Sequence, residues 1–250
     1  MFFTARNYAI HYEVTGSGPL LILLHGMPMW GDLWRERGYV VRLSTEFTVV
    51  TPDLLGHGQS DKPSDPSAYG MTNMATDVLL LLDELGENRA HLWGYSMGAW
   101  VAEAVSVLHP QRARSLIFGG NAPGQSAELR ALTGQPLTEA AAVGDWDAIL
   151  VAGLPADVRD AYVRNNNLAA IGAAGSRFDQ WGCTAEDLKT SGVPTCVYVG
   201  DQEWFIDFAA SSAEAAGASF TSVPGDHRLA FARVDNAVEV ALPHLRANGR

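Results

Sequence analysis

Ser96 stands in the segment His-Leu-Trp-Gly-Tyr-Ser-Met-Gly over residues 91–98, which places the pattern Gly-x-Ser-x-Gly directly after a short apolar run. We expect a strand to end here, a tight turn to hold Ser96, and a helix to follow. Such a turn strains the backbone of the serine and lifts its hydroxyl above the sheet, so the residues two before and two after it must be small. Gly94 and Gly98 meet that demand. The segment therefore predicts a serine nucleophile.

Two further loops contain chemistry-bearing residues beside glycines. The apolar run over 20–24 has the length of a strand buried on both faces of a parallel sheet, and it ends in His25-Gly26-Met27-Pro28. A glycine after a central strand lets the backbone approach a ligand, and the next amide, that of Met27, is then free to point into a cleft. The loop over 51–63 adds the pattern Asp-x-x-Gly-x-Gly-x-Ser, which begins at Asp53.

These three motifs, in this order and spacing, resemble the α/β-hydrolase superfamily over nearly the whole chain. The resemblance is to serine esterases and lactonases, and also to cofactor-free haloperoxidases or perhydrolases and to carbon–carbon bond hydrolases. It implies an α/β fold with a mostly parallel, doubly wound sheet flanked by helices. Runs of strand character near 8–14, 20–24, 48–51, 90–93, 115–118, 195–199 and 219–223, with helical stretches such as 71–85 and 96–108 between them, favour the same class.

The interval between Phe118 and Thr195 is too long for an ordinary connection. We expect a small helical cap over 121–191, inserted after the sixth strand of the family's sheet, with a core formed by 1–120 and 192–250. Helices are expected over 139–150 and 156–166. In the resembling family this interval is the variable lid, so it should select the substrate. The residues that could line a substrate pocket are Met29, Trp30, Trp146, Phe178 and Trp181.

A general base must reach the serine from the loops at the carboxyl ends of the strands. His227 fits best among the seven histidines, because it follows the last strand and precedes the final helix. The family usually places its acid three residues beyond a glycine at the end of the preceding strand, which here is Glu203 rather than an aspartate. Glutamate is one methylene longer than aspartate, which changes how its carboxylate meets the imidazole, so Asp201 stays an alternative for the triad acid.

Composition agrees with a single globular unit of 250 residues, 47% of them hydrophobic, with a net charge of −11. That charge argues against nucleic acid or anionic lipid as a partner. An apolar run of the roughly 20 residues that span a membrane is missing, so we expect a cytoplasmic protein. Cys183 and Cys196 are expected to be packing residues rather than a disulfide. Without a metal-type cluster or a dinucleotide fingerprint, neither a metal nor a cofactor is expected, and the sequence does not indicate an oligomeric state.

Together these features predict a serine hydrolase for a small to moderate, largely apolar carboxylic ester or lactone, working through an acyl-enzyme at Ser96. The backbone N–H groups of Met27 and Met97 would hold the oxyanion. Alternatives are a carbon–carbon bond hydrolase or a cofactor-free perhydrolase with the same triad, and, in another class, a non-catalytic receptor for a small ligand. Haloalkane dehalogenase and epoxide hydrolase activities are disfavoured, because related members have aspartate where Ser96 stands.

Overall fold

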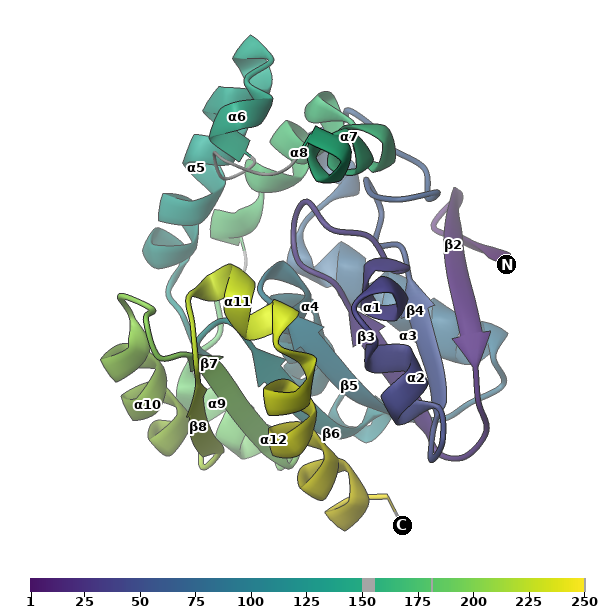
Figure 1. Cartoon of the computed structure of the whole chain (residues 1–250), viewed down its shortest axis with the longest axis vertical. Helices are drawn as coiled ribbons and strands as arrows, with labels where there is room; N and C mark the ends of the chain where they lie inside the picture. Colours follow the sequence, from purple (N-terminus) through teal and green to yellow (C-terminus); the bar gives the residue numbers. More distant parts are fainter. Residues whose placement is uncertain (150–155, 181, 250) are drawn as a thin grey trace.

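The computed structural model describes residues 1–149, 156–180 and 182–249. These residues form a sheet of eight strands in the order β1-β2-β4-β3-β5-β6-β7-β8 (Figure 1). The strands are β1 Phe2–Ala5, β2 Tyr8–Thr15, β3 Leu20–Leu24, β4 Thr48–Pro52, β5 Ala90–Tyr95, β6 Ala113–Gly119, β7 Thr195–Gly200 and β8 Ser219–Val223. Strand β2 runs antiparallel to β1 and β4, and the pairs from β4 through β8 are parallel. The predicted mostly parallel α/β sheet is thus confirmed.

Alternation along the central strands builds one core on each face of the sheet. In β3, Leu20, Ile22 and Leu24 pack into one apolar cluster, whereas Leu21 and Leu23 pack into the other. Successive side chains of a strand point to opposite faces, so a continuous apolar run is what a strand covered on both sides requires.

Helices cover both faces. The α-helices are α1 Leu33–Glu36, α2 Tyr39–Leu43, α3 Met71–Glu84, α4 Met97–Leu108, α5 Ala127–Val143, α6 Trp146–Ile149, α7 Ala156–Asn165, α8 Leu168–Gly175, α9 Ala185–Ser191, α10 Ile206–Ala215, α11 His227–Ala232 and α12 Val234–Ala247. Short 3-10 turns lie at Pro66–Ala68, Pro110–Arg112 and Phe178–Gln180. Helices α3, α4 and α9 contribute to the first cluster, and α1, α2, α11 and α12 to the second. Helices thus cover both faces of the mostly parallel sheet, which is the doubly wound arrangement.

The connection between β6 and β7 rises above the sheet as helices α5 to α8 (Figure 1). The next helix, α9, packs instead against α4 and α10 of the core. We therefore propose that, within the predicted interval 121–191, the cap proper consists of α5 to α8.

Two local predictions differ from the structure. The helix expected over 139–150 is divided, because Gly144 adopts a left-handed conformation (φ 77°) that ends α5 before α6 begins; Leu150 lies outside the described residues. Strand β1 was not predicted. It pairs with β2 through a turn in which Arg6 and Asn7 both have positive φ, without the glycine that usually marks such a hairpin.

Candidate active site

Ser96 occupies the turn between β5 and α4, with φ 54° and ψ −118°. A Cβ on Gly94 would lie 2.2 Å from the Gly98 carbonyl oxygen, and one on Gly98 would lie 2.1 Å from the oxygen of Leu24. Both contacts are shorter than any real side chain tolerates, so the two glycines let β5, α4 and β3 approach each other closely around the serine. The Ser96 N–H donates to the Gly119 oxygen of β6 at 2.9 Å, which ties the strained turn to the neighbouring strand.

The loop after β3 lies directly against the serine. A Cβ on Gly26 would stand 3.0 Å from the Cβ of Ser96. Met27, the next residue, lines the same cavity as Ser96. Met97 is the first residue of α4, and the first N–H groups of a helix have no partner within it. Met27 and Met97, whose backbone amides are predicted to hold the oxyanion, thus belong to the loop after β3 and to the first turn of α4.

Two buried histidines stabilise this loop. Nε2 of His25 accepts the N–H of Leu54 at 3.0 Å, so its Nδ1 carries the proton and donates to the Gly26 oxygen at 2.9 Å. Burial lowers the pKa of His25 to about 4. The pKa of His57, whose ring centroid is 5.0 Å from that of His25, is lowered to about 3 by burial and by that neighbour. Both imidazoles are neutral at pH 7 and hold backbone in place.

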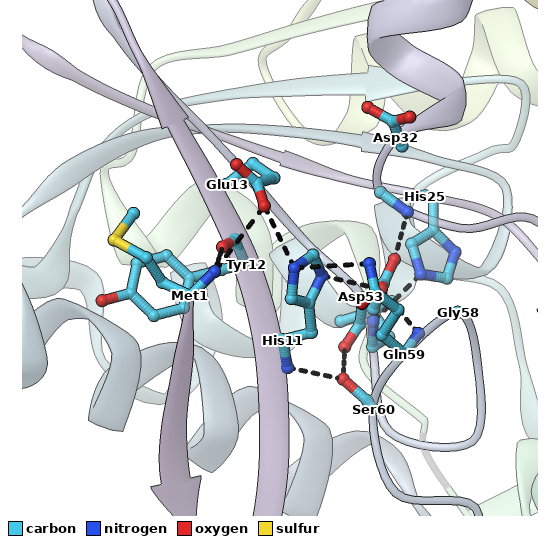
Figure 2. A network of polar contacts seen from close by, with 12 residues as sticks. Met1, His11, Tyr12, Glu13, His25, Asp32, Asp53, Gly58, Gln59 and Ser60 are labelled. Carbon is cyan, nitrogen blue, oxygen red and sulfur yellow. Dashed lines mark hydrogen bonds and ion pairs between the residues drawn. The ribbon is translucent and has the colours of Figure 1, made fainter.

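Asp53 connects the same loop to strand β2. Its carboxylate accepts the N–H groups of Gly31 at 2.6 Å and Gln59 at 2.8 Å, and it lies 3.0 Å from Nδ1 of His11. Figure 2 shows Asp53 at the centre of this group, with Ser60 bonded to the backbone of both His11 and Asp53. The acid of the second glycine motif therefore positions backbone between β2, β4 and the loop after β3.

His227 and Glu203 meet at the carboxyl ends of β7 and β8. Nδ1 of His227 lies 2.8 Å from Oε1 of Glu203. The Glu203 side chain is 8% exposed and that of His227 is 42% exposed, so the carboxylate supports the ring from the protein side. The Tyr95 hydroxyl donates to the His227 carbonyl. Asp226 caps α11 by accepting the N–H groups of Arg228 and Leu229.

Asp201, the alternative acid, makes a different contact. Its Oδ1 accepts the N–H of Gly225 at 2.8 Å, and its own N–H donates to the oxygen of Val223. These bonds fix the conformation of the turn that precedes His227. The two carboxylates after β7 thus have separate partners, and that of Glu203 lies at the imidazole.

A cavity of about 610 Å³ contains both Ser96 and His227. Its apolar lining includes Met27, Met29, Leu33, Leu137, Ile149 and Phe231. Leu137 of α5, Ile149 of α6 and Tyr162 of α7 come from the cap, so the cap roofs a space whose floor is the serine turn. Asn166, between α7 and α8, ties the cap to the loop after β3, because its side-chain amide donates to the Pro28 oxygen at 2.7 Å.

The predicted pocket residues separate into three groups. Met29 lines the cavity. Trp30, Trp146 and Phe178 are not among the described residues that line it: Trp30 packs on Tyr162 with ring centroids 5.2 Å apart, Phe178 packs on Trp100 at the same distance, and Trp146 packs on a small apolar cluster inside the cap. Trp30 and Phe178 thus pack between the core and the segment that follows β6, whereas Trp146 packs within the cap. Trp181 lies outside the described residues.

Sequence reasoning did not single out Tyr162, Arg37 or Arg228, which also line the cavity. Arg228 had an available signal, since it directly follows His227. Arg37 and Tyr162 had none, because only the folded chain brings α1 and α7 to this site.

Other predictions concern the two cysteines, a metal site and a membrane span. Cys183 and Cys196 are buried and free. Over the described ranges, no cluster of three or more His, Cys, Asp or Glu side chains is arranged to hold a metal ion. In those same ranges, no helix is sufficiently long and apolar to cross a membrane.

Comparison with known proteins agrees with this fold. The chain matches the family model for the alpha/beta hydrolase fold over residues 19–191. The enol-lactonase of Burkholderia xenovorans LB400 has a similar structure, with a TM-score of 0.81 and 24% identity over 98% of this chain and 100% of that one. A structure from a study of Nitrososphaera gargenis carboxylesterases gives a TM-score of 0.84 and 18% identity, covering 99% and 98%.

A soluble epoxide hydrolase of Corynebacterium sp. strain C12 is 41% identical over 98 residues, which are 39% of this chain and 32% of that protein. The matched segments span about a third of the length of such curated relatives. Since the family model covers well over half of the chain, the chain belongs to the alpha/beta hydrolase fold family. The printed names of these proteins are those of hydrolases of a lactone, of carboxylic esters and of epoxides.

Proposed function

We propose that this protein is a serine hydrolase that cleaves a small to moderate, largely apolar carboxylic ester or lactone. The observation that carries the proposal is the 2.8 Å contact of Glu203 with His227, which lines the same mostly apolar cavity as Ser96. A serine, an imidazole and a carboxylate in that order along the chain are the parts of an acyl-transfer triad.

The steps follow from the contacts. Glu203 accepts the Nδ1 proton of His227, which leaves Nε2 as the base that takes the Ser96 proton. The Ser96 alkoxide attacks the acyl carbon, and the N–H groups of Met27 and Met97 stabilise the oxyanion, aided by the dipole of α4. The proton on His227 passes to the leaving alcohol as the acyl–oxygen bond breaks. A water molecule activated by the same imidazole then hydrolyses the acyl-enzyme.

One feature supports an ester or lactone rather than an epoxide: serine stands at position 96, where the family resemblance places an aspartate in epoxide hydrolases. The similar structures do not decide between these bonds, because they include epoxide hydrolases beside an enol-lactonase and a carboxylesterase. The apolar lining supports a largely apolar acyl group.

The test is hydrolysis of p-nitrophenyl esters and lactones by wild type and by Ser96→Ala. Removing the nucleophile of a triad lowers kcat by on the order of 10⁶, so we expect no measurable turnover above that of buffer. A fluorophosphonate should label the wild type and not the variant. Ser211→Ala, at an exposed serine of α10, is the matched control and should keep wild-type rates. Retained activity in a contaminant-free Ser96→Ala preparation would refute the proposal.

A further inference from the structure

Two arginines stand at the rim of the cavity that holds Ser96. Arg37 directly follows α1, and Arg228 is the second residue of α11. Both side chains line the cavity and both residues are exposed, so their guanidinium groups border the opening rather than the floor. The remainder of the lining is mainly apolar, and the other charged side chain of the described lining, besides the imidazole of His227, is the carboxylate of Asp226.

The spacing of the two arginines is fixed by the core beneath them. The rings of Trp34 in α1 and Phe231 in α11 pack with centroids 4.9 Å apart, and the Tyr39 hydroxyl donates to the Phe231 oxygen at 2.8 Å. All three aromatic residues are buried. The helices that carry Arg37 and Arg228 therefore cannot move apart without breaking apolar core.

Both cations act on one ring of the cavity wall. Burial raises the pKa of the Tyr162 phenol, and the positive charges of Arg37 and Arg228 oppose that rise. Tyr162 comes from the cap and lines the cavity. Two guanidinium groups thus lie within electrostatic reach of the same part of the wall.

Neither guanidinium group is neutralised by an ion pair with any residue that the structure describes. The nearby carboxylate of Asp226 is bonded to backbone N–H groups at the start of α11. The Glu203 carboxylate is bonded to His227. Glu36 adjoins Arg37 in sequence and is exposed. Two carboxylates lie close by, because Asp226 lines the same cavity and the charge of Glu36 acts on the Tyr162 ring against those of the arginines. Since neither forms an ion pair with Arg37 or Arg228 among the described residues, both guanidinium groups can still bind a ligand anion.

We infer that the substrate carries a carboxylate at the end remote from its scissile carbonyl, held by Arg37 and Arg228 while the apolar body fills the cavity. The inference rests on the proposed function, since it places the reacting carbonyl at Ser96. Guanidinium groups bind carboxylates through paired, charge-assisted hydrogen bonds. The whole chain, with a net charge of −11, repels anions, so any preference for an anionic ester must arise locally.

The test compares two esters that differ only in their far end: p-nitrophenyl hexanoate and the mono-p-nitrophenyl ester of adipic acid. The measured quantity is the ratio of kcat/KM for the adipate ester to that for the hexanoate ester. We expect the Arg37→Gln/Arg228→Gln variant to lower this ratio about tenfold, mainly through KM, as loss of a hydrogen-bonded charge contact does. Raising the salt concentration should lower the wild-type ratio in the same direction.

Arg42→Gln is the matched control. It removes the same charge from the neighbouring surface, where Arg42 pairs with Asp235 and is not among the residues that line the cavity. Its ratio should equal that of the wild type. A ratio unchanged in the double variant, or lowered equally by Arg42→Gln, would overturn the inference while hydrolysis of the hexanoate ester leaves the proposed function standing. Failure of the wild type to hydrolyse either ester or any lactone would overturn both.

Discussion

The ion pair between Arg130 and Glu103 offers a sharp test of how the cap is held on the core. Arg130 lies in α5 of the cap and Glu103 in α4 of the core, and both side chains are 0% exposed. Nη2 of Arg130 lies 2.7 Å from Oε2 of Glu103, and its Nε donates to the oxygen of Gln125 at 3.0 Å. The guanidinium also stacks over the Trp100 ring, 4.7 Å from its centroid.

Replacing Arg130 by methionine keeps most of the apolar stem but removes the guanidinium group that forms an ion pair with the buried Glu103 carboxylate. Removing one partner of a buried pair costs about 3–5 kcal/mol, because the other charge remains desolvated. A domain is stable by about 5–15 kcal/mol, so this single change should remove a large part of the free energy of unfolding. In urea, with a slope of about 3 kcal/mol per molar, the unfolding midpoint should fall by more than about 1 M.

The double variant Glu103→Gln/Arg130→Met separates the charge effect from simple loss of packing. Glutamine keeps an acceptor for the Gly124 N–H, which Oε1 of Glu103 accepts at 2.7 Å, and it removes the carboxylate charge that Arg130 balances in the wild type. We expect the double variant to be more stable than Arg130→Met alone. Arg246→Met, which breaks the exposed pair of Arg246 with Glu46, should shift the midpoint far less. An Arg130→Met midpoint equal to that of Arg246→Met, or a double variant no better than the single one, would refute this reasoning.

Two further predictions concern the catalytic acid and the response to acid. Glu203→Gln should lower kcat by roughly 10⁴, as loss of the orienting carboxylate does in other triads, whereas Asp201→Asn should have a mild effect, because it retains an acceptor for the turn before His227; steady-state ester hydrolysis ranks the two, and the reverse ranking would transfer the role to Asp201. His25 and His57 have folded-state pKa values of about 4 and about 3, below the ordinary value of 6.5. The unfolded chain therefore gains protons below pH 6.5 while the folded protein does not, so the free energy of unfolding should fall as the pH drops from about 6.5 toward 4. Urea titrations at pH values across this range should show that the free energy of unfolding falls less steeply with pH in His57→Phe than in the wild type. Identical slopes would contradict the attribution of this pH dependence to His57.

The serine turn was predictable because its causes are local. Gly94 and Gly98 are needed within a few residues of Ser96, and the strand and helix that flank them have their own apolar patterns. The choice between Glu203 and Asp201 was not local in that sense. It depends on the turn after β8, where Asp201 is bonded to Gly225, and two carboxylates two positions apart give no sequence signal of which one faces the ring.

The cap illustrates the same limit. Aromatic residues were expected to line the pocket, but a large ring can stabilise either a pocket wall or an interface between layers. Phe178 packs on Trp100 of α4, and Trp30 on Tyr162 of α7, so both contribute to joining cap and core. Smaller cap residues such as Leu137 and Ile149 line the cavity instead. Which side of a short helix faces the cavity depends on how the helices of the cap pack, and the sequence pattern of each helix leaves this undetermined.

At the rim of the cavity, the placement of charged side chains depends on the packing of apolar side chains beneath them. Arg37 and Arg228 are far apart in sequence and lack any motif that relates them. They line the same cavity because Trp34 and Phe231 pack against each other and dock α1 on α11. Trp34, together with Phe231, is predictable as core from its type alone, yet it sets the geometry of a charged rim. Substitution of such a core residue should therefore alter substrate choice as well as stability, since the rim keeps its spacing only while the rings beneath it stay packed.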